Sequence, residues 1–179
     1  MRKKLALFLV LSASFNLSLT AWAADSAYDR WSSARRQAAS NPDFAFMDYL
    51  AILRDYPKSA EASEAAFAVG EYYFDQRDYS GAADTFKHFL SRSEDRLEGL
   101  VGLAYLAKSA ELGGDAPLRE LAENTLKQRL ASGHFFMLFE DKHEQPWRSP
   151  FGRRIVMREY VDRLEITLNG SSFYTVQLP

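Results

Sequence analysis

The residues of this chain that could hold a metal ion gather in its C-terminal third. His143-Glu144 begins like a zinc-protease helix motif, in which a second histidine follows three residues after the glutamate. Trp147 occupies that position, and Pro146 excludes the helix that the motif requires. The candidate ligands are His134, Glu140, Asp141, His143 and Glu144. We expect them to be scattered polar loop residues, and we expect no metal site.

Other catalytic signatures are absent from the 179 residues as well. There is no cysteine to act as a nucleophile, no Gly-x-Ser-x-Gly turn, no phosphate-binding glycine loop and no dinucleotide-binding fingerprint. We therefore expect a protein without catalytic residues and without a cofactor.

A group of basic and aromatic residues lies in the same C-terminal region. Five of them form a candidate anion-binding site: Trp147, Arg148, Arg153, Arg154 and Arg158. The site would suit a lipid headgroup, a glycan or an acidic protein. The alternative is a solvated loop whose arginines pair with Glu140, Asp141 and Glu159. We favour the alternative, because charge runs usually lie on solvated faces.

The first 23 residues have the pattern of a secretory signal peptide. A basic start at residues 2–4 precedes the apolar run 5–11, and Ala21-Trp22-Ala23 supplies small residues for cleavage before Ala24. Polar residues interrupt the apolar stretch, which disfavours an uncleaved anchor. Without cysteine, no lipid can be attached at the cleavage site and no disulfide can form. We expect a periplasmic or secreted protein that does not span a membrane once mature.

The charge of the predicted mature chain argues against a nucleic-acid partner. The signal contains three of the 22 lysines and arginines and none of the 24 acidic residues, which leaves 19 basic and 24 acidic residues and a net charge of −5. Phosphate binding needs a clustered positive surface.

Residues typical of helix contacts recur 37 positions apart. The first set is Ala45, Tyr49, Ile52 and Leu53, and the second is Ala82, Phe86, Phe89 and Leu90. A period of 20–50 residues indicates stacked repeats, which usually serve as binding scaffolds.

Local signals divide residues 24–131 into six helices. We expect them at 28–39, 42–56, 60–76, 79–91 and 96–112, with the last beginning after Asp115. Asn41, Asp78 and Asp115 are the predicted N-caps. Close helix crossings are expected at five small residues: Ala45, Gly70, Ala82, Gly102 and Ala122.

Part of this region resembles the tetratricopeptide repeat. The resemblance is carried by Ala66-Phe67-Ala68-Val69-Gly70-Glu71-Tyr72-Tyr73, followed by Ala82 and Phe86, and extends over residues 26–131. The phrase Tyr56-Pro57-Lys58-Ser59-Ala60 is similar to those of periplasmic tetratricopeptide proteins, such as the Tol–Pal accessory protein and outer-membrane assembly lipoproteins. The chain departs from the pattern at Ala66, where the family has tryptophan, and at Glu94, where it has proline.

The resemblance implies three antiparallel helix hairpins stacked as a short solenoid, whose first helices line a concave groove. By position, the groove residues are Arg30, Ala34, Phe67, Glu71, Phe74, Asp75, Leu103 and Leu106. Such a groove would fit a protein segment with apolar anchors and some basic character. The alternative is that Phe67 and Phe74 belong to the core.

Residues 132–179 form a β-rich appendix in this interpretation. Residues 145–152 contain two prolines and a glycine and are expected to form a loop. Alternating apolar residues on both sides of Asn169-Gly170 predict a β-hairpin. An odd-length loop with a glycine bulge would place both apolar sets on one face, which we expect to pack on the last helical hairpin.

Two functions follow from these observations. The first is a mainly α-helical, non-catalytic scaffold that binds a protein partner in the cell envelope through the groove. The second is an adaptor whose C-terminal module binds an anionic glycan or lipid headgroup, with the helices as a spacer.

Overall fold

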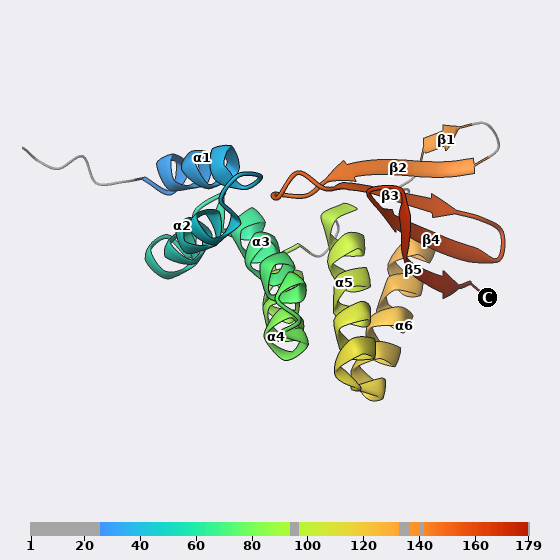
Figure 1. Ribbon diagram of the computed structural model, residues 1–179. Coiled ribbons are helices and arrows are strands. Elements are labelled where there is room, and N and C mark those ends of the chain that lie inside the picture. Colours follow the sequence, from blue (N-terminus) through green and yellow to red (C-terminus); the bar gives the residue numbers. More distant parts are fainter. Residues whose placement is uncertain (1–25, 94–96, 133–136, 140–141, 179) are drawn as a thin grey trace, which may run out of the picture.

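The computed structural model describes residues 26–93, 97–132, 137–139 and 142–178, with backbone alone for 137–139, 142 and 143 (Figure 1). The helices are α1 (Ala27–Gln37), α2 (Pro42–Asp55), α3 (Ala62–Asp75), α4 (Tyr79–Leu90), α5 (Leu97–Gly113) and α6 (Ala116–Ser132). The strands are β1 (Met137–Phe139), β2 (Lys142–Arg148), β3 (Arg154–Glu159), β4 (Arg163–Leu168) and β5 (Ser171–Gln177). The predicted mainly helical chain with C-terminal β-structure is confirmed, while the predicted signal peptide lies outside the described residues.

The helices begin where the local signals place them. Asn41, Asp78 and Asp115 each accept a hydrogen bond from the backbone N–H three residues later, at 2.9–3.3 Å. The predicted N-caps are thus confirmed, because a side-chain oxygen in this geometry satisfies a helix N–H that has no partner within the helix. At α1, Ser26 and Asp29 form a complete capping box.

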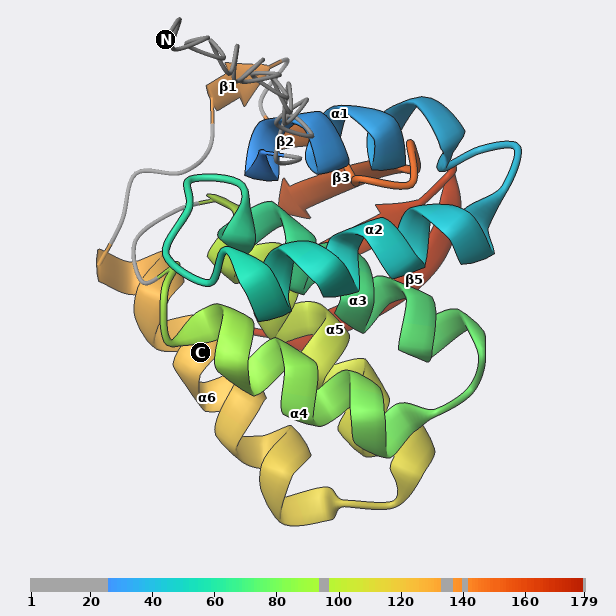
Figure 2. The ribbon, with the colours of Figure 1, turned by 90° about the vertical axis from the view of Figure 1, so that its left-hand side faces the viewer.

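Each helix packs against the next one along the chain. Small residues allow the close approach, as predicted: a Cβ added to Gly70 would lie 2.9 Å from Cζ of Phe86, and one added to Gly102 would lie 2.6 Å from Cε1 of Phe89. Figure 2 shows α2 and α4 on the side of the helical layer that faces away from the strands.

The C-terminal region is larger than the predicted hairpin. It is a five-stranded antiparallel sheet in the order β1-β2-β3-β4-β5. The predicted loop at 145–152 is wrong in its first half, since residues up to Arg148 belong to β2. In the described residues β1 pairs with 142–144, and Pro146 has a ladder partner on the β3 side alone, where proline is tolerated as on an edge strand.

The predicted odd-length β4–β5 loop with a glycine bulge is wrong: Leu168 pairs with Ser171, which leaves a two-residue turn, and a bulge lies within β5 instead. Asn169 and Gly170 both have positive φ, as a two-residue hairpin turn requires. The register then shifts beyond Thr167, and Phe173 is the extra residue in β5. As a result Leu164 and Ile166 face the same way as their partners on β5, and all of these side chains are buried.

The buried face of the sheet packs over α3, α5 and α6 (Figure 1). Phe173 contacts Tyr105 of α5 at a centroid distance of 4.6 Å, and the Tyr174 hydroxyl donates to Glu123 of α6 at 2.5 Å. The sheet therefore covers more of the helical layer than the last hairpin alone. Within the described ranges, no helix is long and apolar enough to cross a membrane.

The close contact at Gly102 leads to a stability prediction. We expect Gly102→Ala to lower the free energy of unfolding by about 1–3 kcal/mol, because the new methyl group would overlap the buried ring of Phe89. Gly113→Ala, at the exposed end of the same helix, is the matched control: its Cβ would meet only Tyr79 at 3.6 Å. Urea denaturation of both variants measures the difference, and equal midpoints would contradict the packing account.

Candidate functional site

The groove residues of α3 face the sheet of the same chain. Phe67 is 1 % exposed, and its ring meets Trp147 of β2 edge to face at 4.8 Å. Phe74 makes a similar contact with Phe173 of β5 at 5.6 Å. The surface predicted to receive a partner is therefore covered from within the molecule.

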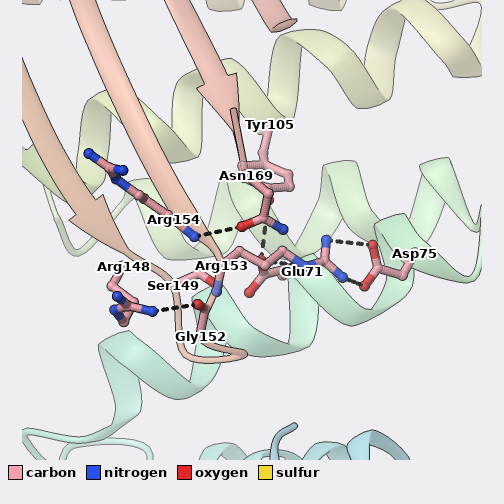
Figure 3. A network of polar contacts seen from close by, with 9 residues as sticks. All are labelled: Glu71, Asp75, Tyr105, Arg148, Ser149, Gly152, Arg153, Arg154 and Asn169. Carbon is pink, nitrogen blue, oxygen red and sulfur yellow. Dashed lines mark hydrogen bonds and ion pairs between the residues drawn. The ribbon is translucent and has the colours of Figure 1, made fainter. Parts of the chain in front are cut away.

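Glu71 lies at the centre of this contact and is completely buried. Its Oε1 accepts a hydrogen bond from the Tyr105 hydroxyl at 3.2 Å and lies 3.5 Å from Nε of Arg153 (Figure 3). Its Oε2 makes no hydrogen bond within the described part of the chain, although the Ser149 hydroxyl lies close enough to act on the carboxyl. An incompletely satisfied buried carboxyl is costly.

Asp75 completes an acidic pair with Glu71. The two residues are one helical turn apart and lie on the same face of α3. The Arg153 guanidinium donates to both carboxylate oxygens of Asp75, one of these bonds measuring 2.7 Å. A two-pronged contact of this kind fixes the orientation of the arginine.

The β2–β3 turn (residues 149–153) positions Arg153 beside Glu71 and Asp75. The Ser149 N–H donates to the carbonyl of Arg153 at 3.0 Å, and the Ser149 hydroxyl accepts from the Arg153 N–H at 3.2 Å. Gly152 donates to the Ser149 carbonyl and has a φ of +80°, which favours glycine. The turn is thus fixed by its own hydrogen bonds before it meets the helices.

Burial and charge oppose each other in this network. Burial raises the pKa of Glu71 to about 7, although Arg153 and the hydroxyls of Ser149 and Tyr105 act to lower it. Burial works against the charged form of Arg153, but the hydrogen bonds to Asp75 and the charge of Glu71 outweigh it and raise its pKa. Burial also raises the pKa of Tyr105 well above its usual value, and Glu71 adds to this.

Phe151, at the tip of the β2–β3 turn, reaches the N-terminal helices. Its ring centroid lies 6.0 Å from that of Tyr49 in α2 and 6.4 Å from that of Tyr72 in α3. A cleft of about 330 Å³ lies on one side of the turn, and another of about 370 Å³ lies on the other.

The other groove residues are mostly inaccessible. Ala34, Leu103 and Leu106 are buried. Arg30 is half-buried beside Asp48, at 3.7 Å. Among the groove residues, Asp75 is the most open, and Phe74 is half-buried.

The structure separates the predicted anion-binding residues. Trp147 and Arg153 are directed to the helices, and Arg158 pairs with Glu144 at 3.0 Å. Arg148 donates to the carbonyl of Gly152, and the Arg154 side chain is exposed. Arg153 and Arg158 do find acidic partners, on α3 and β2 respectively. The expected partners Glu140 and Asp141 lie outside the described residues.

Of the five candidate metal ligands, the side chain of Glu144 alone lies within the described part of the chain. His134, Glu140 and Asp141 lie outside the described residues, as does the side chain of His143. Among the side chains that the structure does describe, no three His, Asp or Glu residues cluster in a way that could hold a metal ion.

Comparison with known proteins leaves the site to be interpreted from its geometry. No family model matches the chain, and no curated protein is significantly similar to it in sequence. What the arrangement can do is hold a basic and aromatic turn against an acidic and aromatic helix face. The sequence signal for this was the acid pair Glu71 and Asp75 close to Phe67 and Phe74, together with the excess of arginines near residue 150.

Removal of Arg153 should destabilise the fold. We expect Arg153→Ala to lower the free energy of unfolding by about 2–4 kcal/mol, because it leaves the buried Glu71 carboxyl without its cation. Arg154→Ala is the control, with an expected change within about 0.5 kcal/mol, since that side chain is exposed. Urea denaturation near pH 8 measures both, and equal losses would show that the ion pair contributes nothing specific.

Glu71 should also make stability depend on pH. Its folded pKa of about 7 lies above the usual value of 4.5, so the folded state keeps a proton that the unfolded state releases. The contribution of Glu71 to the free energy of unfolding is therefore greatest below pH 4.5, and it falls by about 3 kcal/mol as pH rises to about 7.

Glu71→Gln removes that titration and is the variant to compare. We expect the variant to gain stability relative to the wild type as pH rises from 5 to 8, in denaturation series at constant ionic strength. Arg153 and Asp75 are present in both proteins, so their contributions largely cancel. Parallel stability curves for the two proteins would contradict the raised pKa.

Proposed function

We propose that the protein is a non-catalytic scaffold of the tetratricopeptide type, which binds a protein partner through the groove between its first helices. The setting is the periplasm or the cell exterior, and envelope assembly or maintenance is the role that the resemblance suggests. The proposal rests on the sequence pattern of three stacked helix hairpins and on the helix order, in which each helix packs on its neighbour.

One observation carries the proposal: the groove already holds a polypeptide segment. The acidic and aromatic face of α3 binds Arg153 through Glu71 and Asp75, and binds Trp147 through Phe67. Recognition by an arginine fork and buried aromatic rings is the chemistry that dominates protein–protein interfaces. The same face is therefore suited to a partner segment of similar chemistry.

A second candidate function is supported by the outer face of the sheet. Arg148 and Arg154 pair directly across β2 and β3, and both are exposed. Two adjacent exposed arginines could bind an anionic glycan or lipid headgroup, with the helices as a support. We favour the groove, because its contacts are buried and directional.

In-cell photocrosslinking distinguishes the two surfaces. We expect a photoreactive residue at Gln76, which lines the cleft beside Asp75, to give a discrete protein adduct in the cells that naturally make the protein. His88, exposed on α4, is the control site and should give none. An adduct from Arg154 alone would favour the second candidate, and the absence of any site-dependent adduct would count against both.

A further inference from the structure

The β2–β3 turn interrupts the space between the helices and the sheet. Pro150 lines the cleft of about 330 Å³, together with Phe67 and Glu64. Phe151 and Arg153 line the cleft of about 370 Å³ on the other side. The two clefts therefore adjoin the same turn, and displacement of that turn would join them along the face of α3.

The turn makes its apolar contact apart from those of the rest of the sheet. The apolar face of the sheet belongs to one hydrophobic cluster with α3, α4, α5 and α6. A second cluster joins α1, α2 and α3, and in the described part of the sheet region only Phe151 packs against it. The turn is thus the main apolar link between the sheet and the N-terminal helices.

The closed arrangement also leaves polar groups poorly satisfied. Oε2 of Glu71 and the hydroxyl of Tyr49 are buried without hydrogen-bond partners in the described residues. Both lie where the turn meets the helices, since Tyr49 contacts Phe151 and Glu71 contacts Arg153. A segment that supplied hydrogen-bond donors to these atoms would reduce the free-energy cost of burying them, and could therefore replace the turn.

We propose that the β2–β3 turn is an intramolecular occupant of the groove, and that a protein partner displaces it with an exposed segment carrying an arginine and an aromatic residue. This inference rests on the proposed function and names the partner's chemistry. When the turn leaves, Glu71 and Asp75 lose their cation, so the groove selects a positively charged replacement. The aromatic residue replaces Phe151 between Tyr49 and Tyr72.

A peptide copy of the turn tests this competition. The probe is a cyclised peptide of residues 147–155, Trp-Arg-Ser-Pro-Phe-Gly-Arg-Arg-Ile. If the turn occupies the groove, only the open molecules can bind the peptide. The apparent affinity of the wild-type protein is then the affinity of the open form multiplied by the fraction of molecules that are open. We expect the double variant Phe151→Ala with Arg153→Ala to bind the peptide at least tenfold more tightly than the wild type, measured by fluorescence anisotropy.

Two controls and a milder variant make the result specific. A peptide with Arg153→Glu should bind neither protein, and the protein variant Arg154→Ala, whose exposed side chain lies outside both clefts, should behave as the wild type. Gly152→Ala keeps both anchors but strains the positive φ of the turn, so it should bind the peptide several-fold more tightly. It replaces the double variant if that protein does not fold.

Equal affinities of the wild type and the opened variants would overturn the inference, as would equal binding of the charge-reversed peptide. A partner captured from Gln76 whose binding is unchanged by Gly152→Ala would also overturn it, while the proposed function would stand. Peptide binding by the opened variants without any partner captured from Gln76 would support the inference and count against the proposed function.

Discussion

The burial of the Glu71 carboxyl is the constraint on which the arrangement of helices and sheet depends. A carboxyl without access to water needs a cation or hydrogen-bond donors, and Glu71 receives Arg153 from the sheet and Tyr105 from α5. Glu71 and its two partners come from three separate elements, so the contact fixes how the β2–β3 turn enters the helical layer. Arg153 is directed further by Asp75, one turn along α3.

The helices were predictable because their information is local. Asn41 and Asp78 are N-caps, and each side chain accepts a hydrogen bond from the backbone N–H only three residues along the chain. Gly70 and Gly102 mark close contacts because a larger side chain would overlap a neighbouring aromatic ring. Such signals can be interpreted from sequence without knowing which element lies opposite.

The sheet and the site were less predictable because their information is not local. Pro146 is typical of a loop, and its place in β2 becomes evident only when the pairing with β3 is known. The arginines near residue 150 carry no sign of which acid they will meet, and Arg153 pairs with an aspartate 78 residues away. The expected groove positions came from a repeat pattern, which describes only the helices and therefore could not reveal the sheet that packs on Phe67 and Phe74.

The contact between the β2–β3 turn and α3 is made by an ion pair, Glu71 with Arg153, and not by apolar side chains alone. Well-packed apolar side chains in place of a buried ion pair often give equal or greater stability, because desolvation offsets much of the attraction. Positions 71 and 153 hold charges instead, beside aromatic rings that already bury apolar surface. Such a contact discriminates between occupants, since an uncharged segment would leave Glu71 and Asp75 without their cation. Selectivity of this kind fixes how the turn sits on α3, and it is also the property that the proposed binding groove would require.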